Sequence, residues 1–515
     1  MKGIDRSRTP YSLGPNHPSS VTLSRREMVS FLGSGVLFSG LAACFSQTAR
    51  EAPPAQLQDE LYYSSTVALA HAIRTKQVSS EEVVKACLDR IEEVNPMLNA
   101  VVQLVVEEAL AKAREADAGV ARGEFKGPLH GVPMTIKDSL DTAGVISTGG
   151  TKGRAAFIPE TDATVVSRLK NAGAILIGKT NTPELTLSFE TDNLVYGRTS
   201  NPYDVTRTSG GSSGGAAAIV AAGGAPFDIG SDRLGSVRLP AHFCGVAGIK
   251  PSAGRVPRTG HIYPFGGMLD SFQQIGPLAR YVDDLALLLP IIAGPDWIDP
   301  AIIPMPLGSP KDVDLSKLRV SFHTDNGVKT PTAETVEVIR AAAKALSDEN
   351  ILVEEARPDG IEESMELSIL TQADGGSAVR RLLKEAGTTE HTLHGDTERS
   401  PLSTQELDTL VTRWDAFRSR MQSFLQNYDV ILCPVNADPA LLHGSMSASD
   451  AMLAFSYTFT CNLTGWPGTV VRGGTSPEGL PIGLQIIAGP GREDVTLAVA
   501  KHLETALGGF HPPSV

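Results

Sequence analysis

Residues 225–251 read APFDIGSDRLGSVRLPAHFCGVAGIKP, and the fold prediction starts from this stretch. The apolar residues 227–229 predict a strand, residues 230–235 predict a turn bounded by glycines, and Ser236 begins the next segment. A serine where a strand passes into a helix has backbone N–H groups of the turn directed at it. Those N–H groups are the donors that an oxyanion hole requires. Ser236 is therefore a candidate nucleophile.

A second stretch rich in serine lies upstream, TSGGSSGGAAAIVAAGG at residues 208–224. Ser212 and Ser213 stand between pairs of glycines, ahead of an alanine-rich run that predicts a helix over residues 216–222. Residues 210–214 match the GxSxG pattern of a nucleophile elbow, but an elbow follows a core strand and the preceding residues predict a loop. This match alone is weak evidence for a nucleophile.

Lys137 follows a short apolar strand predicted for residues 132–136. Burial at that position would remove water from the amine and favour its neutral form. A neutral amine can accept a proton, as the base of a serine–lysine hydrolase must. The alternative is an ion pair of Lys137 with Asp138 or Asp141, and the residues alone do not decide between the two.

The order of predicted elements indicates an α/β fold with a parallel or mixed sheet, because strands and helices alternate with glycine-containing turns. From about residue 330 to 427 the sequence becomes charged and mostly helical. Besides the elements given above, the predicted strands are residues 174–177, 429–435 and 479–489, and the predicted helices are residues 79–96, 105–122, 162–172 and 494–507.

The composition limits the function classes. The chain has 515 residues, 41% hydrophobic and 20% charged, which allows a large core. Its net charge of -13 argues against a nucleic-acid partner, which would require an excess of Lys and Arg. The 11 histidines show no HxH or HExxH spacing and the 5 cysteines no CxxC, so no metal site is predicted. We expect buried thiols, with a single disulfide as the alternative.

The N-terminal residues predict an export signal. Arg25 and Arg26 precede a moderately apolar stretch, residues 29–43, which is shorter than the about 20 residues that a membrane-spanning helix needs. The twin arginine is typical of one export route, and the sequence ending at Cys44 resembles a lipoprotein cleavage box. We therefore expect residues 1–43 to be removed and the protein to be periplasmic or associated with the cell envelope. Lipidation of Cys44 and ordinary cleavage nearby both stay open.

Three motifs, in this order, resemble the amidase signature family: Lys137 in xKDS, Ser212 in GGSSGG, and Ser236 in GSDxxGSxRxPAxFCGxxGxKP. The segments LHGVPMTIKD, TGGT, GKTNTPE, TDNLVYGRTSNP and GLPIGLQI agree with the same family. The resemblance covers residues 64–261 and resumes at 429–505. It implies the family's fold, a single α/β domain with a mixed, twisted sheet of about eleven strands covered by helices.

The resemblance also implies roles for individual residues, with no cofactor and no metal ion. Ser236 is the implied nucleophile that forms an acyl-enzyme, Lys137 the base, and Ser212, preceded by a cis peptide bond, the relay between them. The implied oxyanion donors are the backbone N–H groups of Arg233, Leu234, Gly235 and Ser236. The implied supporting residues are Gly211, Ser213, Asp232 and Arg238, the last two as an ion pair, unless that pair lies on the surface.

The sequence departs from the family beside the nucleophile. Family members usually read GSDTGGSIR, whereas residues 230–238 read GSDRLGSVR. A positive φ at Leu234 would strain the backbone by about 1 kcal/mol or more. Arg233 and Leu234 are expected to narrow the pocket or add a positive contact, and so to alter substrate choice. The alternative is that activity is lost.

The expected function is hydrolysis of C–N bonds in small amides, extended to carbamates (urethanes), because the pattern is similar to bacterial amidases that cleave aryl amides and urethanes. The expected organisation is a linker over residues 44–60 and an amidase domain over residues 61–510, whose residues 330–427 form a variable substrate channel. We expect a monomer or homodimer. Two alternatives are the A subunit of a tRNA-dependent amidotransferase, against which the export signal argues, and a non-catalytic binding protein.

Overall fold

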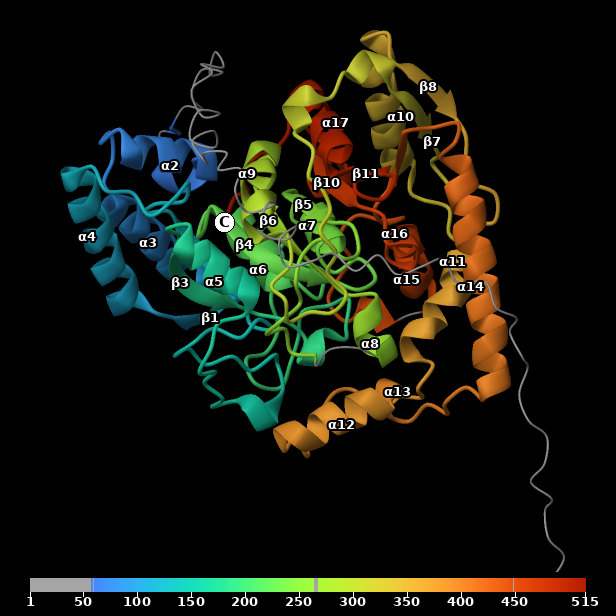
Figure 1. Cartoon of the computed structure of the whole chain (residues 1–515), viewed down its shortest axis with the longest axis horizontal. Coiled ribbons are helices and arrows are strands. Elements are labelled where there is room, and N and C mark those ends of the chain that lie inside the picture. Colours follow the sequence, from blue (N-terminus) through green and yellow to red (C-terminus); the bar gives the residue numbers. More distant parts are fainter. Residues whose placement is uncertain (1–56, 59, 264–266, 448) are drawn as a thin grey trace, which may run out of the picture. The chain divides into compact units, whose positions relative to one another are not determined.

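One mixed sheet of eleven strands runs through the described part of the chain (Figure 1). The computed structural model describes residues 57–58, 60–263, 267–447 and 449–515, which belong to the unit Pro54–Val515. The strands lie in the order β1-β3-β2-β4-β6-β5-β10-β11-β9-β7-β8. Their bounds are β1 Val101–Leu104, β2 Pro133–Lys137, β3 Ile175–Thr180, β4 Phe227–Asp232, β5 Ala247–Lys250, β6 Gln274–Ala279, β7 Arg319–Phe322, β8 Leu352–Glu355, β9 Val430–Pro434, β10 Gly468–Thr475 and β11 Pro481–Ala488. The predicted α/β fold and strand number are confirmed.

Helices pack on the sheet and enclose the two largest hydrophobic clusters of the described residues. One cluster includes side chains of α5, α9, α10 and α17, and the other includes side chains of α3, α4, α6 and α7. The helices are α2 Thr66–Arg74, α3 Ser80–Leu98, α4 Val106–Arg122, α5 Thr164–Asn171, α6 Gly214–Ala221, α7 Arg238–Phe243, α8 Gly267–Ser271, α9 Val282–Ile292, α10 Ala333–Asp348, α11 Glu363–Leu367, α12 Ser377–Ala386, α13 His394–Thr397, α14 Thr404–Phe424, α15 Ser449–Ala454, α16 Phe459–Thr464 and α17 Glu493–Ala506.

The expected export signal and Cys44 lie outside the described residues. In the described ranges, no helix combines the length and the apolar character needed to cross a bilayer. The other four cysteines are buried free thiols, so the alternative of a disulfide among these four does not occur.

Helix α3 shows how local sequence sets an element and where that inference fails. Ser79 and Glu82 form a capping box, in which the Glu82 N–H donates to Ser79 Oγ at 3.1 Å and the Ser79 N–H to Glu82 Oε2 at 2.8 Å. The prediction that Pro96 ends the helix is wrong, since the helix continues to Leu98. Pro96 removes one N–H donor, but Asn99, at a φ of 48°, ends the helix.

Strands β2 and β4 are parallel neighbours and buried along their whole length. Their carboxyl ends therefore meet at the same edge of the sheet. Strand β4 continues through Asp232, three residues into the predicted turn, because residues 230–232 pair with residues 274–276 of the antiparallel strand β6. This extension places Ser231 and Asp232 beside the end of β2, where the candidate base Lys137 lies.

The GGSSGG loop leads into α6, whose eight residues are all buried. Small residues are required here because neighbouring backbone approaches closely. A Cβ on Gly215 would lie 2.4 Å from the Asn181 backbone nitrogen. The glycine and alanine content of residues 214–221 thus reflects tight packing under the serines.

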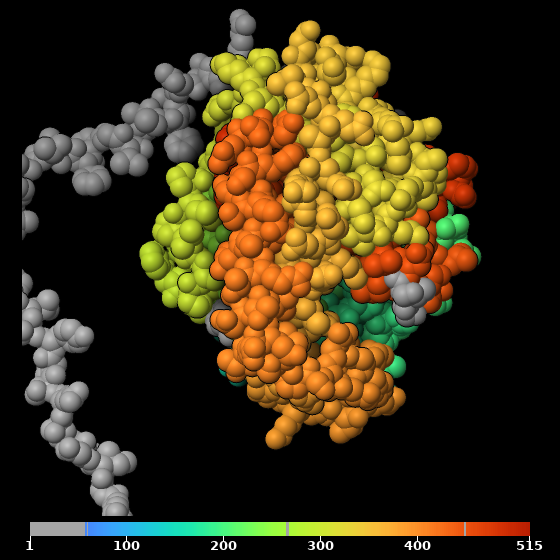
Figure 2. Space-filling view, turned by 90° about the vertical axis from the view of Figure 1, so that its right-hand side faces the viewer, coloured from blue at the N-terminus to red at the C-terminus, as the bar shows by residue number. Residues whose placement is uncertain are grey.

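The region predicted to be charged and helical contains α10 to α14 and one strand, β8, at the edge of the sheet. Strand β8 pairs in parallel with β7. Helix α14 runs along one side of the molecule, with α12 and α13 near its lower end (Figures 1 and 2). Helices α11 and α13 and the segment 368–372 contribute residues to the pocket of the site described next.

Candidate active site

Lys137 ends β2 with its amine inside a group of three hydroxyls. The Nζ atom lies 2.7 Å from Ser212 Oγ, 3.0 Å from Ser213 Oγ and 3.0 Å from Ser231 Oγ. The Lys137 side chain is fully buried. Two separate motifs of the sequence, the end of β2 and the GGSSGG loop, therefore meet at this amine.

The alternative ion pairs of Lys137 do not form. Asp138 accepts hydrogen bonds from the Thr148 hydroxyl at 2.5 Å and the Thr148 N–H at 3.0 Å. Asp141 is paired with Arg154, whose Nη2 lies 2.8 Å from Asp141 Oδ1. Both acids adjacent in sequence are thus engaged elsewhere.

Burial controls the protonation of Lys137. Loss of water lowers the pKa of Lys137 to about 7, and the negative charges of Asp228 and Asp232 oppose the lowering. An amine whose pKa is near neutrality exists in both protonation states near pH 7. It can therefore take up and return a proton during one reaction cycle.

The GGSSGG loop joins Lys137 to the segment that contains Ser236. The Gly211–Ser212 peptide bond is cis. The Ser213 N–H donates to the Ser236 carbonyl oxygen at 3.1 Å, which ties this loop to the segment after β4. Ser236 is 7% exposed and lines a pocket, and its hydroxyl has no hydrogen-bond partner among the described residues.

Asp232 and Arg238 form a buried ion pair under Ser236, so the alternative of a surface pair does not hold. Both side chains are 0% exposed, with Arg238 Nη2 3.0 Å from Asp232 Oδ1 and Nε 3.0 Å from Oδ2. Burial raises the pKa of Asp232, but the charge and hydrogen bonds of Arg238 outweigh it and hold that pKa well below its usual range. Asp232 also accepts from the N–H groups of Gly235 and Val237, at 2.8 and 3.2 Å, and so shapes the loop.

The expected oxyanion donors are not equivalent. The N–H of Gly235, one of the implied oxyanion donors, already donates to Asp232 Oδ1 at 2.8 Å. The N–H groups of Arg233, Leu234 and Ser236 donate no hydrogen bond within the described ranges. The positive φ of this loop, 123°, is at Gly235 and not at Leu234, so the conditional strain at Leu234 does not arise.

Two further polar residues at the amine were not predicted from the sequence. Ser231 contacts Lys137, and His261 Nε2 lies 3.1 Å from Ser231 Oγ. Burial lowers the pKa of His261 well below its usual range, and the charge of Lys137 lowers it further, so the imidazole is neutral. Ser231 could have been suspected from its place beside Asp232. The residues around His261 carry no sequence signal for a site. Its backbone forms a bridge to Leu140, a residue distant in sequence, and this contact brings it to the site.

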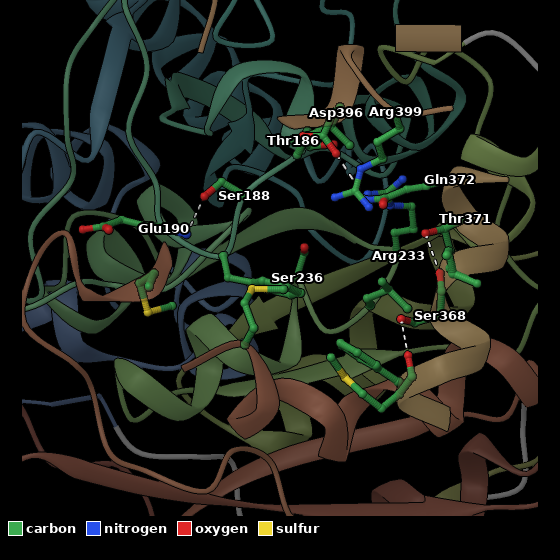
Figure 3. Close-up of a pocket in the computed structure, with 18 of the residues that line it drawn as sticks. Thr186, Ser188, Glu190, Arg233, Ser236, Ser368, Thr371, Gln372, Asp396 and Arg399 are labelled. Atoms are coloured by element: carbon green, nitrogen blue, oxygen red, sulfur yellow. Dashed lines mark hydrogen bonds between the residues drawn. The ribbon is translucent and has the colours of Figure 1, made fainter. Parts of the chain in front are cut away.

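The hydroxyl of Ser236 faces a pocket of about 680 Å³ (Figure 3). The loop after β4 contributes Arg233 and Leu234 to its wall, and the helical region contributes residues between Met365 and Arg399. Much of the remaining lining is apolar, and includes Phe189, Met446, Met452 and Phe459. The pocket can therefore hold an organic substrate against Ser236.

The chain is similar to known proteins over most of its length. A family model described as Amidase matches residues 82–497. Fatty-acid amide hydrolase 2-B of Danio rerio is 36% identical over 500 residues, covering 90% of this chain and 93% of that protein. The A subunit of glutamyl-tRNA(Gln) amidotransferase from Carboxydothermus hydrogenoformans is 35% identical over 489 residues, covering 86% and 97%. The solved structure of 6-aminohexanoate cyclic dimer hydrolase with its substrate has a TM-score of 0.78 at 27% identity, covering 87% and 97%.

Proposed function

Because the chain belongs to the amidase signature family, whose members hydrolyse amides, we propose that it is an amidase with Ser236 as nucleophile and Ser212 and Lys137 as proton relay. One observation carries the proposal: the buried Lys137 amine, with its pKa near 7, lies 2.7 Å from Ser212 Oγ. A neutral lysine among hydroxyls is the base that an activated serine requires.

The reaction begins when Ser236 Oγ bonds to the amide carbonyl carbon. The Ser236 proton passes to Ser212 Oγ, whose own proton passes to Lys137 Nζ. Collapse of the tetrahedral intermediate breaks the C–N bond, and the relay runs in reverse to protonate the leaving nitrogen. Water then attacks the acyl-enzyme by the same relay, which releases the acid and restores Ser236.

The developing oxyanion requires donors beside Ser236. The unengaged N–H groups of Arg233, Leu234 and Ser236 are the candidates, since that of Gly235 is held by Asp232. Removing one such donor typically costs about 10²- to 10³-fold in rate. The buried Asp232–Arg238 pair would fix these amides before substrate binds.

Small amides with an apolar part fit the lining of the pocket. Carbamates present the same carbonyl carbon and C–N bond to Ser236, so we include them as substrates. Hydrolysis of an N-aryl carbamate, measured as release of the aniline, tests this extension separately. A chain that cleaves anilides but leaves the carbamate intact would limit the function to amides.

The decisive experiment measures release of 4-nitroaniline from a neutral acyl anilide by the purified chain and by Ser236→Ala. We expect turnover by the natural chain, loss in Ser236→Ala, and no change in the matched surface variant Ser316→Ala. A folded natural chain without turnover across anilides, aliphatic amides and lipid amides would favour the non-catalytic alternative.

A second candidate function follows from the identity to the A chain of an amidotransferase. Such a protein works with partner proteins, whereas an independent amidase needs none. If the purified chain hydrolyses amides alone and recovers no partner in a pull-down from its own cells, the amidotransferase alternative is excluded. Size-exclusion chromatography with light scattering would then decide between monomer and homodimer.

We also propose that the protein is exported, on the sequence evidence of Arg25 and Arg26. Replacing both with lysine should retain the protein in the cytoplasm. Loss of membrane association in Cys44→Ala would identify a lipid anchor, whereas unchanged fractionation would indicate ordinary cleavage. Export of the double-lysine variant at the natural level would contradict the twin-arginine route.

A further inference from the structure

Arg233 is the charged side chain of the pocket that lies closest in sequence to Ser236. It follows the end of β4 by one residue, and the last part of its side chain reaches into the region lined by Gln372, Asp396 and Arg399 (Figure 3). The Arg233 side chain is half-buried, and its Nη1 atom is buried without a hydrogen-bond partner in the described ranges. A guanidinium offers five N–H donors, so a buried donor without a partner is an unsatisfied cationic site.

The acidic side chains of the pocket do not satisfy Arg233. Glu190 is held by His443 Nδ1 at 2.9 Å, and Glu366 by Arg413 Nη2 at 2.7 Å. Asp396 Oδ1 accepts from the Gln372 Nε2 group at 3.2 Å. Each acid has a partner of its own, and among the described residues no carboxylate lies within 4.0 Å of the Arg233 guanidinium.

The charge of Arg233 acts on Asp396, which lines the same pocket. Burial raises the pKa of Asp396, while the charges of Arg233 and Arg399 lower it. The two groups thus attract each other without direct contact. Arg399 is exposed, and its Nε donates to the Gly395 carbonyl oxygen at 2.9 Å, whereas Arg233 is half-buried.

We propose that Arg233 is a recognition site for a carboxylate on the substrate, so that the preferred substrates are amides that carry a carboxylate near the scissile bond. This inference rests on the proposed amidase function and names its substrate class. A carboxylate matches the planar donor geometry of a guanidinium in two parallel hydrogen bonds. Arg233 and Ser236 line the same pocket, so a carboxylate bound at Arg233 would hold the amide carbonyl near the nucleophile.

The carboxylate could belong to the acyl part or to the leaving amine, and two pairs of chromogenic substrates distinguish these sources. The acyl pair is the mono-4-nitroanilide of glutaric acid and hexanoyl-4-nitroanilide. The amine pair is the butanoyl amide of 5-amino-2-nitrobenzoic acid and butanoyl-4-nitroanilide. The readout is the ratio of kcat/KM for the charged substrate to that for its neutral partner.

We expect the natural chain to prefer the charged member of one pair, and Arg233→Met to lower that ratio by about 10- to 100-fold. Arg233→Lys should retain part of the preference, because it keeps the positive charge but cannot form two parallel hydrogen bonds with a carboxylate. Asp396→Asn should raise the ratio, because it removes a competing negative charge. Arg381→Met, a matched exchange at an exposed position of α12 outside the pocket lining, should leave the ratio unchanged.

Two results would overturn the inference. One is a natural chain with no preference for the charged member of either pair. The other is an Arg233→Met variant whose kcat/KM falls equally for the charged and the neutral substrate of a pair. The role of Arg233 would then not involve a substrate charge. Both outcomes are separable from failure of the proposed function, because hydrolysis of the neutral anilides and its loss in Ser236→Ala do not depend on the ratio.

Discussion

Two regions of the molecule differ in how their polar groups are satisfied. One is the edge of the sheet at the ends of β2 and β4, and the other is the wall of the pocket. At the edge, Lys137 is surrounded by three hydroxyls and Asp232 is paired with Arg238, all of them buried. In the wall, Arg233 reaches into the pocket with a buried donor that has no partner among the described residues. A buried lysine amine and ion pair that are fully engaged suit a fixed proton relay, whereas an unsatisfied group beside a cavity is free to bind a ligand. Substitutions at the edge should therefore reduce turnover or stability, and those in the wall should change selectivity.

The largest effect is expected from Lys137→Met, which removes the base and keeps a long apolar chain. The kcat for a neutral anilide should fall by about 10²- to 10⁴-fold, the range that general acid–base catalysis contributes. Steady-state kinetics with the matched surface variant Lys344→Met as control checks this. A kcat within 10-fold of the natural value would show that Lys137 is not the base.

The buried ion pair should dominate stability at the sheet edge. Arg238→Met leaves Asp232 buried without its partner and should lower the free energy of unfolding by about 3–5 kcal/mol. The exposed pair of Arg418 with Asp415 offers a control, since Arg418→Met should cost less than about 1 kcal/mol. Urea unfolding followed by fluorescence compares the two. Equal losses would remove the distinction between a buried and an exposed pair.

The pH dependence of kcat/KM tests the charge balance around Lys137. The neutral amine is the base, so activity should rise with pH through about 7. The charge of Asp228 raises the pKa of Lys137, so Asp228→Asn should move the rising limb to lower pH. A shift to higher pH, or a profile flat between pH 5 and 9, would contradict this assignment.

A smaller effect is expected at His261, which acts through Ser231. When Lys137 is protonated it donates to Ser231, whose hydroxyl must then donate to another acceptor, and neutral His261 Nε2 is 3.1 Å away. His261→Phe should lower kcat by about 10-fold with little change in KM. His261→Gln, which keeps an acceptor, should recover part of that loss. Equal losses in both variants would reduce His261 to a packing role.

The smallest effect belongs to the apolar wall. Ile369→Ala enlarges the pocket in the wall formed by the helical region and touches no member of the proton relay, so kcat for an acetyl anilide should change by less than about 3-fold. The KM for a long-chain acyl anilide should rise, because apolar contact area is lost. A large fall in kcat for the acetyl substrate would show that the wall and the sheet edge are not separable.

The sequence predicted those features that depend on local motifs. Lys137, Ser212 and Ser236 each stand in a short pattern with its own structural cue, and the structure brings the lysine and the GGSSGG loop together. The alternation of strands and helices likewise predicted the α/β sheet. Pro96 shows the limit of local cues. It predicted the end of a helix, but α3 continues past it to Leu98.

Other features depend on contacts between distant segments, which local patterns do not encode. His261 reaches the site through a backbone bridge to Leu140. The Gly235 N–H is engaged because the Asp232 side chain folds back to accept its hydrogen bond. The unsatisfied state of Arg233 depends on partners that Glu190 and Asp396 find elsewhere. The sequence suggested a positive contact at Arg233, but only the packing of the helical region shows that its donor is unused.

The most direct test of the central claim is to find which serine carries the acyl group. Trypsin cleaves after Arg207, Arg233 and Arg238, so Ser212 lies on the peptide of residues 208–233 and Ser236 on LGSVR, residues 234–238. The chain is quenched with acid during turnover of an activated acyl substrate, digested and analysed by mass spectrometry. We predict the acyl mass on LGSVR, with no adduct in Ser236→Ala. An adduct on the peptide that contains Ser212 would contradict the account.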